Sequence, residues 1–361
     1  MKHSKIGVGI VGIGFGQHVL LPAFAQDPRC QVTAICASND QRAMAVAKKN
    51  AIQSPYGDWR KLIDSATVNA IAIATPPALQ SEIVTAAMAA GKPVFCEKPL
   101  ATSLAKASSV AAAAKLAGLA NMVDFEFPEI SVWQECKRIL TAGGVGRVRH
   151  FTVNWNVETY VVRERLNSWK TQRRLGGGTL NLFVSHVFHY LEWFFGPITE
   201  LCCQMFVTTP GAAQQDLSET LVNLSCTTAD HVSGTVTVST DAFLGTGHSL
   251  EVYGEEGTVL LRNETPDYIK GFRLLQGTRA AMKLNELSAT ESTSSQDGRL
   301  IAVGKLVRRF IDWVESGRPE GPDFQDGLRV QQLLDCAVRS NESGQKVNCG
   351  LCSDTLSVEG N

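Results

Sequence analysis

The sequence predicts an α/β fold in which the first third of the chain forms a doubly wound parallel sheet. Short apolar strands alternate with helical patterns from the N-terminus onward, and this alternation favours parallel strands joined by right-handed crossover helices. A glycine-rich turn follows the first strand, and a lysine directly before a proline follows a later one. Ligands of such sheets bind beyond the carboxyl ends of the strands, so both features lie where a ligand is expected.

The first strand leads into a dinucleotide-binding fingerprint. A largely apolar strand, Ile6–Val11, is followed by the turn Gly12–Gln17 and then by a helical pattern. Gly12 permits the tight turn, and Gly14 lets the backbone approach a pyrophosphate that faces the helix N-terminus. The third glycine of the fingerprint is missing, because Gln17 stands there. A glycine-rich turn without a ligand is the alternative. We expect the cofactor to contact this turn through Gly12, Gly14, Phe15, Gly16 and Gln17.

The end of the second strand favours NADP as the cofactor, with NAD possible. Dinucleotide-binding domains usually carry an acidic residue there for the ribose hydroxyls, but this chain has Ala37. Ser38 and Asn39 can donate hydrogen bonds to a 2′-phosphate, and Arg42 can pair with it. Alternatively, Asp40 and Arg42 merely begin the next helix, with Asp40 as its N-cap.

Two later strand ends complete the expected ligand edge. Thr75–Pro77 follows one strand, and its two prolines fix an extended loop. The apolar run Val94–Cys96 ends in Glu97–Pro99. The proline has no N–H and disfavours helix at Lys98, so the strand stops there. A lysine held between a carboxylate and a proline is well placed for chemistry, although an ordinary surface ion pair would look the same.

Composition excludes several classes of protein. The chain has 361 residues, 44% of them hydrophobic and 19% charged, with a formal net charge of -1, which fits two folded domains. No basic excess indicates nucleic acid, and no apolar run approaches the ~20 residues that span a membrane. Lysines precede an apolar run near the N-terminus, but glycines interrupt it. We therefore expect a mature cytoplasmic protein. The ten cysteines, several of them inside apolar segments, support this expectation, because buried reduced thiols are typical of cytoplasmic proteins.

A helix predicted over Thr179–Phe195 carries candidate functional side chains. Leu182, His186, His189 and Trp193 recur at spacings of four, three and four, so they share one helix face. The two histidines have metal-like spacing, but no carboxylate joins them on that face, so no metal is predicted. Burial beside a leucine disfavours the imidazolium, so His186 should be mainly neutral at pH 7.

The segment before this helix is a candidate lid. Arg163–Arg174 is charged and polar around Trp169. A lid over the substrate is the functional interpretation, and a solvated connection is the alternative. Further strands are predicted at His150–Val157, Leu201–Val207, Glu219–Ser225, Val232–Ser239, Ser249–Tyr253 and Thr258–Arg262, and helices at Val303–Glu315 and Asp326–Ser340.

Six short motifs resemble those of one known family and occur along nearly the whole chain. They are Gly12–Gly14, Ala74–Pro77, Cys96–Pro99, Gly176–Gly178 with Ser185–His186, Leu250–Gly257, and Pro322–Gly327. In this order they resemble the Gfo/Idh/MocA oxidoreductases, the family of glucose-fructose oxidoreductase and inositol dehydrogenase. The resemblance implies a Rossmann domain over residues 1–124 and an α+β domain over residues 125–361. It further implies that the second domain contains a large, mainly antiparallel sheet that often mediates homodimers or homotetramers.

The resemblance also implies a reaction. Most members of the family transfer hydride between nicotinamide and a hydroxyl or keto carbon of a sugar, a sugar derivative or a polyol. Lys98 would lie beside the nicotinamide, and its bond to Pro99 is often cis. The chain departs from the family at Gln80, where a histidine is common, and at His189, where an aspartate is common. It also has Leu182 in place of the aspartate that usually precedes His186 by one turn.

These inferences give a set of expected roles. Lys98 would stabilise negative charge on the reacting oxygen, Lys98 or His186 would supply the proton, and Glu97 would orient Lys98. The expected cofactor contacts also include Thr75, Pro76, Glu97 and Lys98. The expected substrate contacts are Lys98, Trp169, Asn181, His186 and His189.

Two other functions stay open. One is a reductase or diol dehydrogenase acting on a non-sugar small molecule. The other is a non-catalytic NAD(P)-binding regulator with the same fold. Leu182 favours the regulator, whereas the retained Glu97–Pro99 motif opposes it, because a sensor needs no acid–base lysine.

Overall fold

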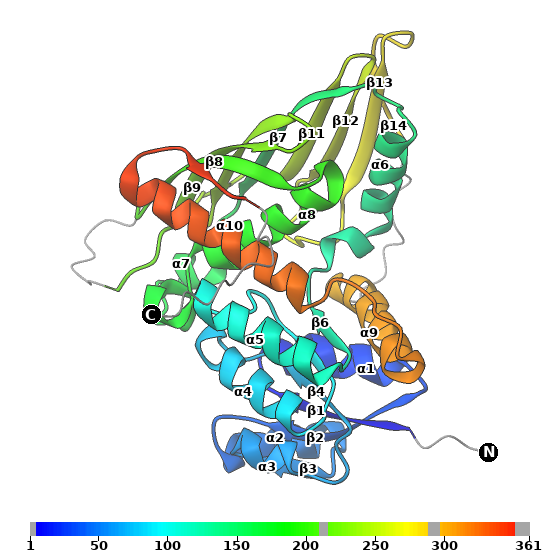
Figure 1. Ribbon diagram of the computed structural model, residues 1–361, viewed down its shortest axis with the longest axis vertical. Coiled ribbons are helices and arrows are strands. Elements are labelled where there is room, and N and C mark those ends of the chain that lie inside the picture. The colour runs from blue at the N-terminus through cyan, green and yellow to red at the C-terminus, as the bar shows by residue number, and fades with distance from the viewer. Residues whose placement is uncertain (1–4, 209–215, 288–296, 351–361) are drawn as a thin grey trace, which may run out of the picture.

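Two β-sheets organise the chain, and they lie toward opposite ends of the molecule (Figure 1). The computed structural model describes residues 5–208, 216–287 and 297–350. Among these residues, no helix is both long and apolar enough to span a bilayer.

The first sheet is the predicted doubly wound parallel sheet. Its six strands have the order β3-β2-β1-β4-β5-β6 and pair in parallel. They are β1 (Ile6–Val11), β2 (Cys30–Cys36), β3 (Ser54–Tyr56), β4 (Ala70–Ile73), β5 (Val94–Cys96) and β6 (Asn121–Val123). The order reverses beside β1, and this reversal places a crevice at the carboxyl ends of β1 and β4.

Helices of this domain cover both faces of the sheet. They are α1 (Leu21–Gln26), α2 (Asp40–Asn50), α3 (Trp59–Ile63), α4 (Pro77–Ala89) and α5 (Leu104–Ala117). The predicted N-cap of α2 was wrong by one residue. The Asn39 side chain accepts the Arg42 N–H and caps the helix, whereas Asp40 accepts the Gly57 N–H at 2.6 Å.

The second sheet has nine strands in the order β14-β13-β12-β11-β7-β10-β9-β8-β15. They are β7 (Val148–Asn156), β8 (Ile198–Phe206), β9 (Leu221–Thr228), β10 (Ser233–Ser239), β11 (Gly247–Gly254), β12 (Gly257–Asn263), β13 (Arg273–Thr278), β14 (Leu284–Glu286) and β15 (Val347–Asn348). Among the described strand pairs of this second sheet, only β7 and β10 are parallel. The predicted α/β fold with a large, mainly antiparallel second sheet is therefore confirmed.

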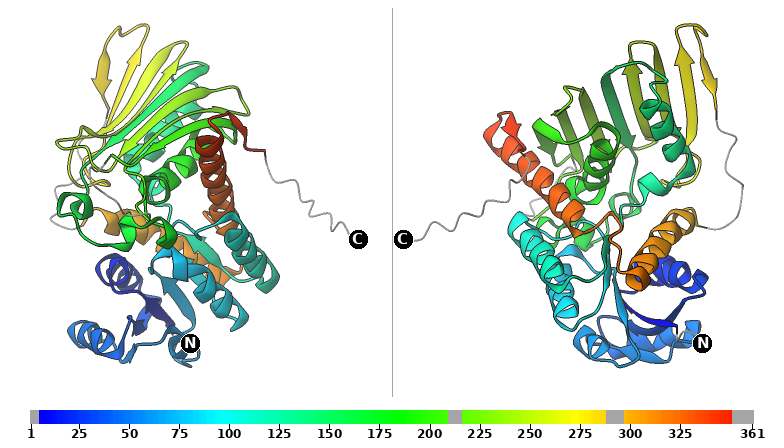
Figure 2. Two further views of the ribbon diagram at one scale, coloured as in Figure 1. Left: turned by 90° about the vertical axis from the view of Figure 1, so that its left-hand side faces the viewer. Right: turned by 45° about the vertical axis from the view of Figure 1, so that its right-hand side comes forward.

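One face of this sheet packs against helices. Figure 2 shows α8 (Ser185–Phe195) and α10 (Phe324–Ser343) lying together along it, and α6 (Ser131–Thr141) packs near β12 and β13. In β9, Val222, Leu224 and Cys226 are buried, whereas Asn223 between them is partly buried and Ser225 is exposed. The opposite face of the sheet is therefore polar and more exposed. Helix α10 also contacts α5, so it joins the two domains.

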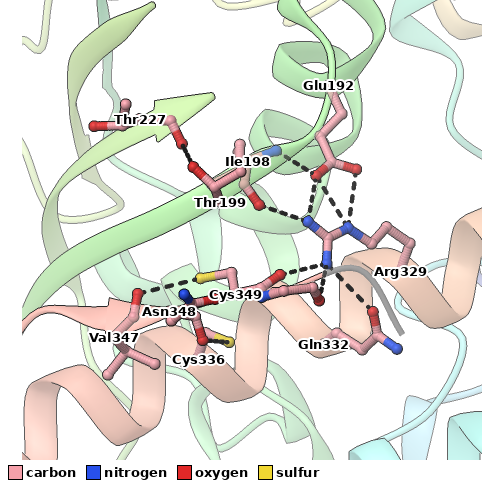
Figure 3. A network of polar contacts seen from close by, with 11 residues as sticks. Glu192, Ile198, Thr199, Thr227, Arg329, Gln332, Cys336, Val347, Asn348 and Cys349 are labelled. Atoms are coloured by element: carbon pink, nitrogen blue, oxygen red, sulfur yellow. Dashed lines mark hydrogen bonds and ion pairs between the residues drawn. The ribbon is translucent and has the colours of Figure 1, made fainter. Parts of the chain in front are cut away.

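An arginine at the end of this layer joins four segments. Figure 3 shows the Arg329 guanidinium from α10 between the Glu192 carboxylate of α8, at 2.8 Å, and two backbone carbonyls. The carbonyl of Ile198 begins β8, and that of Cys349 follows β15. Because Arg329 is largely buried, these charge-assisted bonds fix the helices against the sheet edge.

Helix α9 (Arg299–Ser316) returns from the second sheet to the first. Its apolar face joins the core beneath β1, and the rings of Phe24, Phe95 and Phe310 meet edge to face at 5.8–6.3 Å. The predicted boundary between residues 124 and 125 stays a prediction. In space, however, α9 packs on the first sheet, and Arg299 at its N-terminus lies at the crevice.

Candidate active site between the two sheets

A cleft of about 2010 Å³ lies at the carboxyl ends of the first sheet's strands. Its lining comes from both domains. Of the predicted site residues, the lining includes Gly12, Gly14, Phe15, Ser38, Arg42, Thr75, Pro76, Glu97, Lys98, Trp169 and His186. The other predicted site residues, Gly16, Gln17, Asn39, Asn181 and His189, are not among the described residues that line it.

The glycine turn leaves room for a phosphate-bearing cofactor. Gly12 has a φ of +108°, and a Cβ there would lie 2.2 Å from the Ala74 carbonyl oxygen, so a side chain is excluded. A Cβ on Gly14 would meet nothing within 4 Å, so its backbone faces open cleft. The Thr75 hydroxyl also lines the cleft and is buried without a hydrogen-bond partner in the described structure. These features fit a bound dinucleotide.

Gly16 serves packing within the described structure. It begins a π-helical turn, Gly16–Leu20, and a Cβ would lie 2.9 Å from the Ile10 side chain. It therefore allows the close helix–strand approach that the third glycine of the fingerprint usually provides. Gly16 thus takes the packing role of the third glycine, one position earlier in the sequence.

At the far end of the cleft, Ser38 and Arg42 are joined. The Arg42 guanidinium donates to the Ser38 hydroxyl at 2.9 Å, and both side chains line the cleft. Arg60 lines the same end and stacks on Trp59, 4.1 Å from the ring centre. The side chain of Asn39 is occupied by capping α2. The Arg60 guanidinium is itself paired with the Glu82 carboxylate at 2.6 Å, so this end of the cleft offers the Arg42 guanidinium and the Ser38 hydroxyl to an anion.

Lys98 lies where the sheets face each other. Its Nζ donates to the backbone carbonyl oxygen of Leu182 at 2.8 Å, within the π-helical turn Leu180–Val184 that precedes α8. Such turns are frequent at functional sites. The Lys98–Pro99 bond is cis, as the family resemblance implied. Glu97 accepts the backbone N–H of Lys98, and Gln80 donates to the Glu97 carbonyl at 2.9 Å. Glu97 thus contacts Lys98 through the backbone N–H, and its role in orienting the lysine stays a prediction.

Three carboxyl groups gather behind Lys98, and the sequence analysis identified only one of them. Asp124 and Glu126, just after β6, are 1% and 2% exposed. Burial, followed by the neighbouring carboxyls of Glu97 and Glu126, raises the pKa of Asp124 well above its ordinary value. Burial also raises the pKa of Glu97, although the Lys98 charge opposes it. Both Asp124 carboxyl oxygens are buried without a hydrogen-bond partner in the described structure.

His186 lines the cleft and is 3% exposed. Burial, followed by the charge of Lys98, lowers its pKa well below the ordinary value, in agreement with the expected neutral imidazole. Its Nδ1 is buried without a hydrogen-bond partner in the part of the chain that the structure describes, and lies 3.7 Å from a Glu126 oxygen.

His189 does not share this cleft, contrary to the expectation that it binds the same substrate. It lines a separate pocket and stacks on Phe125 with ring centres 4.3 Å apart. Burial lowers its pKa to about 3. Three residues fall about 60° short of a full helical turn, so His189 does not point in the same direction from the helix as His186, and the two rings meet Phe125 differently, His189 stacked on it and His186 edge to face.

The candidate lid segment contributes two side chains to the cleft. Trp169 and Lys170 both line it. Desolvation, then the positive charges of Lys98 and Arg299, lowers the pKa of Lys170. Asn181 instead donates to the Gly177 carbonyl at 3.3 Å. A lid function of this segment stays a prediction.

Sequence reasoning missed several residues of the site. They are Glu126, Lys170, Tyr268 and Arg299. The Arg299 guanidinium lies 5.3 Å from the centre of the Phe15 ring, so the start of α9 covers the glycine turn. Only Glu126 had a readable signal, because acidic residues alternate with phenylalanines directly after a parallel strand. No cluster of metal-ligand type, with three or more members, occurs among the described residues.

Comparisons with known proteins agree with this architecture. Sequence models match residues 6–125 to the oxidoreductase family with an NAD-binding Rossmann fold, and residues 133–260 to the Gfo/Idh/MocA C-terminal domain. An uncharacterized oxidoreductase of Synechocystis sp. is 29% identical over 94% of this chain and 95% of its own. Inositol 2-dehydrogenase of Pseudomonas fluorescens is 25% identical over 96% and 97%.

A solved structure supports the fold. Levoglucosan dehydrogenase in complex with NADH and L-sorbose superposes with a TM-score of 0.85 at 21% identity, covering 96% of this chain and 99% of its own. The two family matches together span more than half of the sequence, in the order of the two sheets. The chain therefore belongs to the Gfo/Idh/MocA family of oxidoreductases with an NAD-binding Rossmann domain.

Proposed function

We propose that this protein is an NADP-preferring dehydrogenase that transfers hydride between the nicotinamide and a hydroxyl or keto carbon of a sugar, a sugar derivative or a polyol. The observation that carries the proposal is Lys98, at a strand end, facing a cleft that also holds His186. The similarity to inositol 2-dehydrogenase and levoglucosan dehydrogenase supports the substrate class. The bound nicotinamide would take up or supply the hydride.

The chain's own residues have separable roles in this proposal. The glycine turn and Thr75 would hold the phosphates, and Ser38 with Arg42 would hold the 2′-phosphate. The Lys98 ammonium would stabilise negative charge on the substrate oxygen. Lys98 or His186 would move the proton between that oxygen and the protein. Trp169 and Lys170 would contact the rest of the substrate.

A cofactor and substrate screen tests the proposal. The purified chain is assayed for NADP and NAD reduction with sugars and polyols, and for NADPH oxidation with ketosugars. Turnover with a carbohydrate supports it. Turnover only with non-sugar diols or ketones would assign a different substrate class. Cofactor binding without any turnover would favour the regulator, which Leu182 makes the main rival.

The NADP preference predicts the effect of two substitutions. Arg42→Ala should weaken NADPH binding by about tenfold or more and leave NADH binding nearly unchanged, because only NADPH carries the 2′-phosphate. Ala37→Asp should weaken NADPH by roughly 1–3 kcal/mol through charge repulsion. Fluorescence titration with each reduced cofactor measures both effects.

Lys49→Ala is the matched control, since it removes an exposed positive charge from the last turn of the same helix, α2. It should leave both affinities unchanged. NADH binding equal to or tighter than NADPH in the parent would contradict the preference.

We also propose a homodimer or homotetramer in which the polar face of the nine-stranded sheet contacts its copy. Family resemblance and the incomplete burial of that face support this assembly. A monomeric mass in sedimentation equilibrium at micromolar concentration would contradict it. A cytoplasmic location stays a prediction.

A further inference from the structure

His186 lacks the aspartate that usually accompanies it in the family, yet a carboxyl group lies beside it. Glu126 Oε2 is 3.7 Å from His186 Nδ1, and both side chains are 3% exposed. The two residues come from different elements, the loop after β6 and helix α8. Position 182 offers no carboxyl, and its backbone carbonyl accepts from the Lys98 amine.

The buried Nδ1 of His186 lacks a hydrogen-bond partner among the described residues. Leaving a buried polar atom unpaired is costly. A distance of 3.7 Å is too long for a hydrogen bond. Catalytic hydrogen bonds are often long before a substrate binds and tighten afterwards. The ionisable oxygen that lies close enough to form this hydrogen bond after a small movement is Glu126 Oε2.

We propose that Glu126 supplies the carboxyl that position 182 lacks, and that its protonation decides which ring nitrogen of His186 carries the proton. Glu126 would thereby act as a positioning residue for His186. The chemical consequence rests on the proposed dehydrogenase function, but the coupling between the two residues does not.

The two protonation states of Glu126 serve opposite directions of reaction. An ionised Glu126 accepts the Nδ1–H of His186, so Nε2 presents a lone pair to the cleft. During oxidation the substrate C–H and O–H bonds break and a C=O bond forms. A bound nicotinamide would take up the hydride, and the hydroxyl proton would pass to Nε2 as the Nδ1 proton passes to Glu126. In reduction the protonated Glu126 returns its proton to Nδ1, and Nε2–H donates to the substrate oxygen.

This relay suits the environment of the ring. Burial and the charge of Lys98 oppose a positive imidazole, and moving one proton onto the ring as another leaves it keeps the ring neutral. Burial raises the pKa of Glu126 to about 7, with Lys98 opposing and Glu97 adding to that rise. The carboxyl can therefore take or release a proton near neutral pH, as acid–base catalysis requires.

Other charged groups also face the pair and must be included in its titration. Around Glu126 these are Glu97, Lys98, Asp124 and the Tyr268 hydroxyl, and around His186 they are Lys98, His189 and His248. Burial, followed by the neighbouring carboxyls of Glu97 and Glu126, raises the pKa of Asp124 well above the ordinary value. Burial lowers the pKa of both His189 and His248 to about 3, so they stay neutral.

The direct test is ¹⁵N NMR of the full-length, cofactor-free protein with labelled histidine, from pH 5.5 to 8.5. His186→Asn assigns the His186 signals by their loss. In the parent we expect the His186 nitrogens to exchange tautomers with a midpoint near pH 7, without ring protonation. In Glu126→Gln the exchange should vanish, because the amide cannot titrate. In Asp124→Asn, which removes a neighbouring carboxyl and leaves Glu126 in place, it should persist.

The outcomes separate this inference from the proposed function. A His186 tautomer that stays constant in the parent, or one that still changes in Glu126→Gln, overturns the coupling whatever the enzyme turns over. Once a substrate is known, the pH profile gives a second readout. Glu126→Gln should lower kcat at least about tenfold, with KM less affected, and remove the titration near pH 7, whereas Glu126→Asp should keep a shifted one. An unchanged profile in Glu126→Gln would overturn the relay.

Discussion

Replacing Lys98 with methionine is expected to leave a folded protein that still binds its cofactor but has lost at least ~10² in turnover. Methionine keeps the length and the apolar stem of the side chain and removes the charge. That charge is the cation at the point where the glycine turn, the carboxyl cluster and His186 converge. Without it, negative charge on the reacting oxygen would lack its preorganised partner. Steady-state kinetics and cofactor fluorescence measure the two properties separately.

The same substitution also removes one structural contact, so it needs a control. Lys98 donates to the Leu182 carbonyl, and its loss could disturb the start of α8. Lys92→Met is a suitable match, because Lys92 precedes the same strand and its amine donates to the Ile63 and Ser65 carbonyls, outside the cleft. The control should lower stability and keep turnover per folded molecule. Near-normal turnover of Lys98→Met would remove Lys98 from the mechanism.

The site residues that the sequence predicted are those that short sequence segments identify by themselves. Gly12 and Lys98 each follow an apolar strand of a parallel sheet, and such strands end at a common edge. The family motifs at the same positions agree. A short segment therefore carries enough information to place these residues together, and the cleft does contain both of them.

The site residues that were not predicted come from segments that are distant in sequence. Arg299 begins a helix that lies after the second sheet in sequence but packs on the first. No local pattern reports that packing, because the apolar face of α9 would suit either sheet. Glu126 escaped notice for a related reason. The substitution at Leu182 is visible in the sequence, whereas a compensating carboxyl from another element becomes visible only in three dimensions.

Helix and strand periodicity set a further limit. A face assigned from spacings of three and four is wide, and His189 lies just beyond the part of it that reaches the cleft. The short strands β13 and β14, at one end of the second sheet, were missed because their residues are only partly buried or exposed, apart from Leu274. Without a buried face, the alternation that signals a strand is weak.

Glu126→Gln is expected to stabilise the folded protein by about 3 kcal/mol above neutral pH and to change its stability little near pH 4. The pKa of Glu126 is 4.5 when unfolded and about 7 when folded, and each pKa unit is worth about 1.4 kcal/mol. Because the folded pKa is the higher one, the fold favours the protonated carboxyl. That contribution is complete below pH 4.5 and is lost as pH rises through 7. Glutamine resembles the protonated acid and does not titrate, so the variant avoids the loss.

Urea unfolding of parent and variant at intervals from pH 4 to 8.5 measures this difference without any substrate. The stability of both proteins will vary with pH, because Glu97 and Asp124 also have raised pKa values. Only the difference between parent and variant in the free energy of unfolding reports on Glu126. This difference should increase from near zero at pH 4.5 to its full value above pH 7. Glu342→Gln, at an exposed position on α10, should follow the parent throughout. A constant difference between parent and Glu126→Gln would mean that Glu126 does not titrate in the folded state as its burial requires, and the proton relay through His186 would lose its basis.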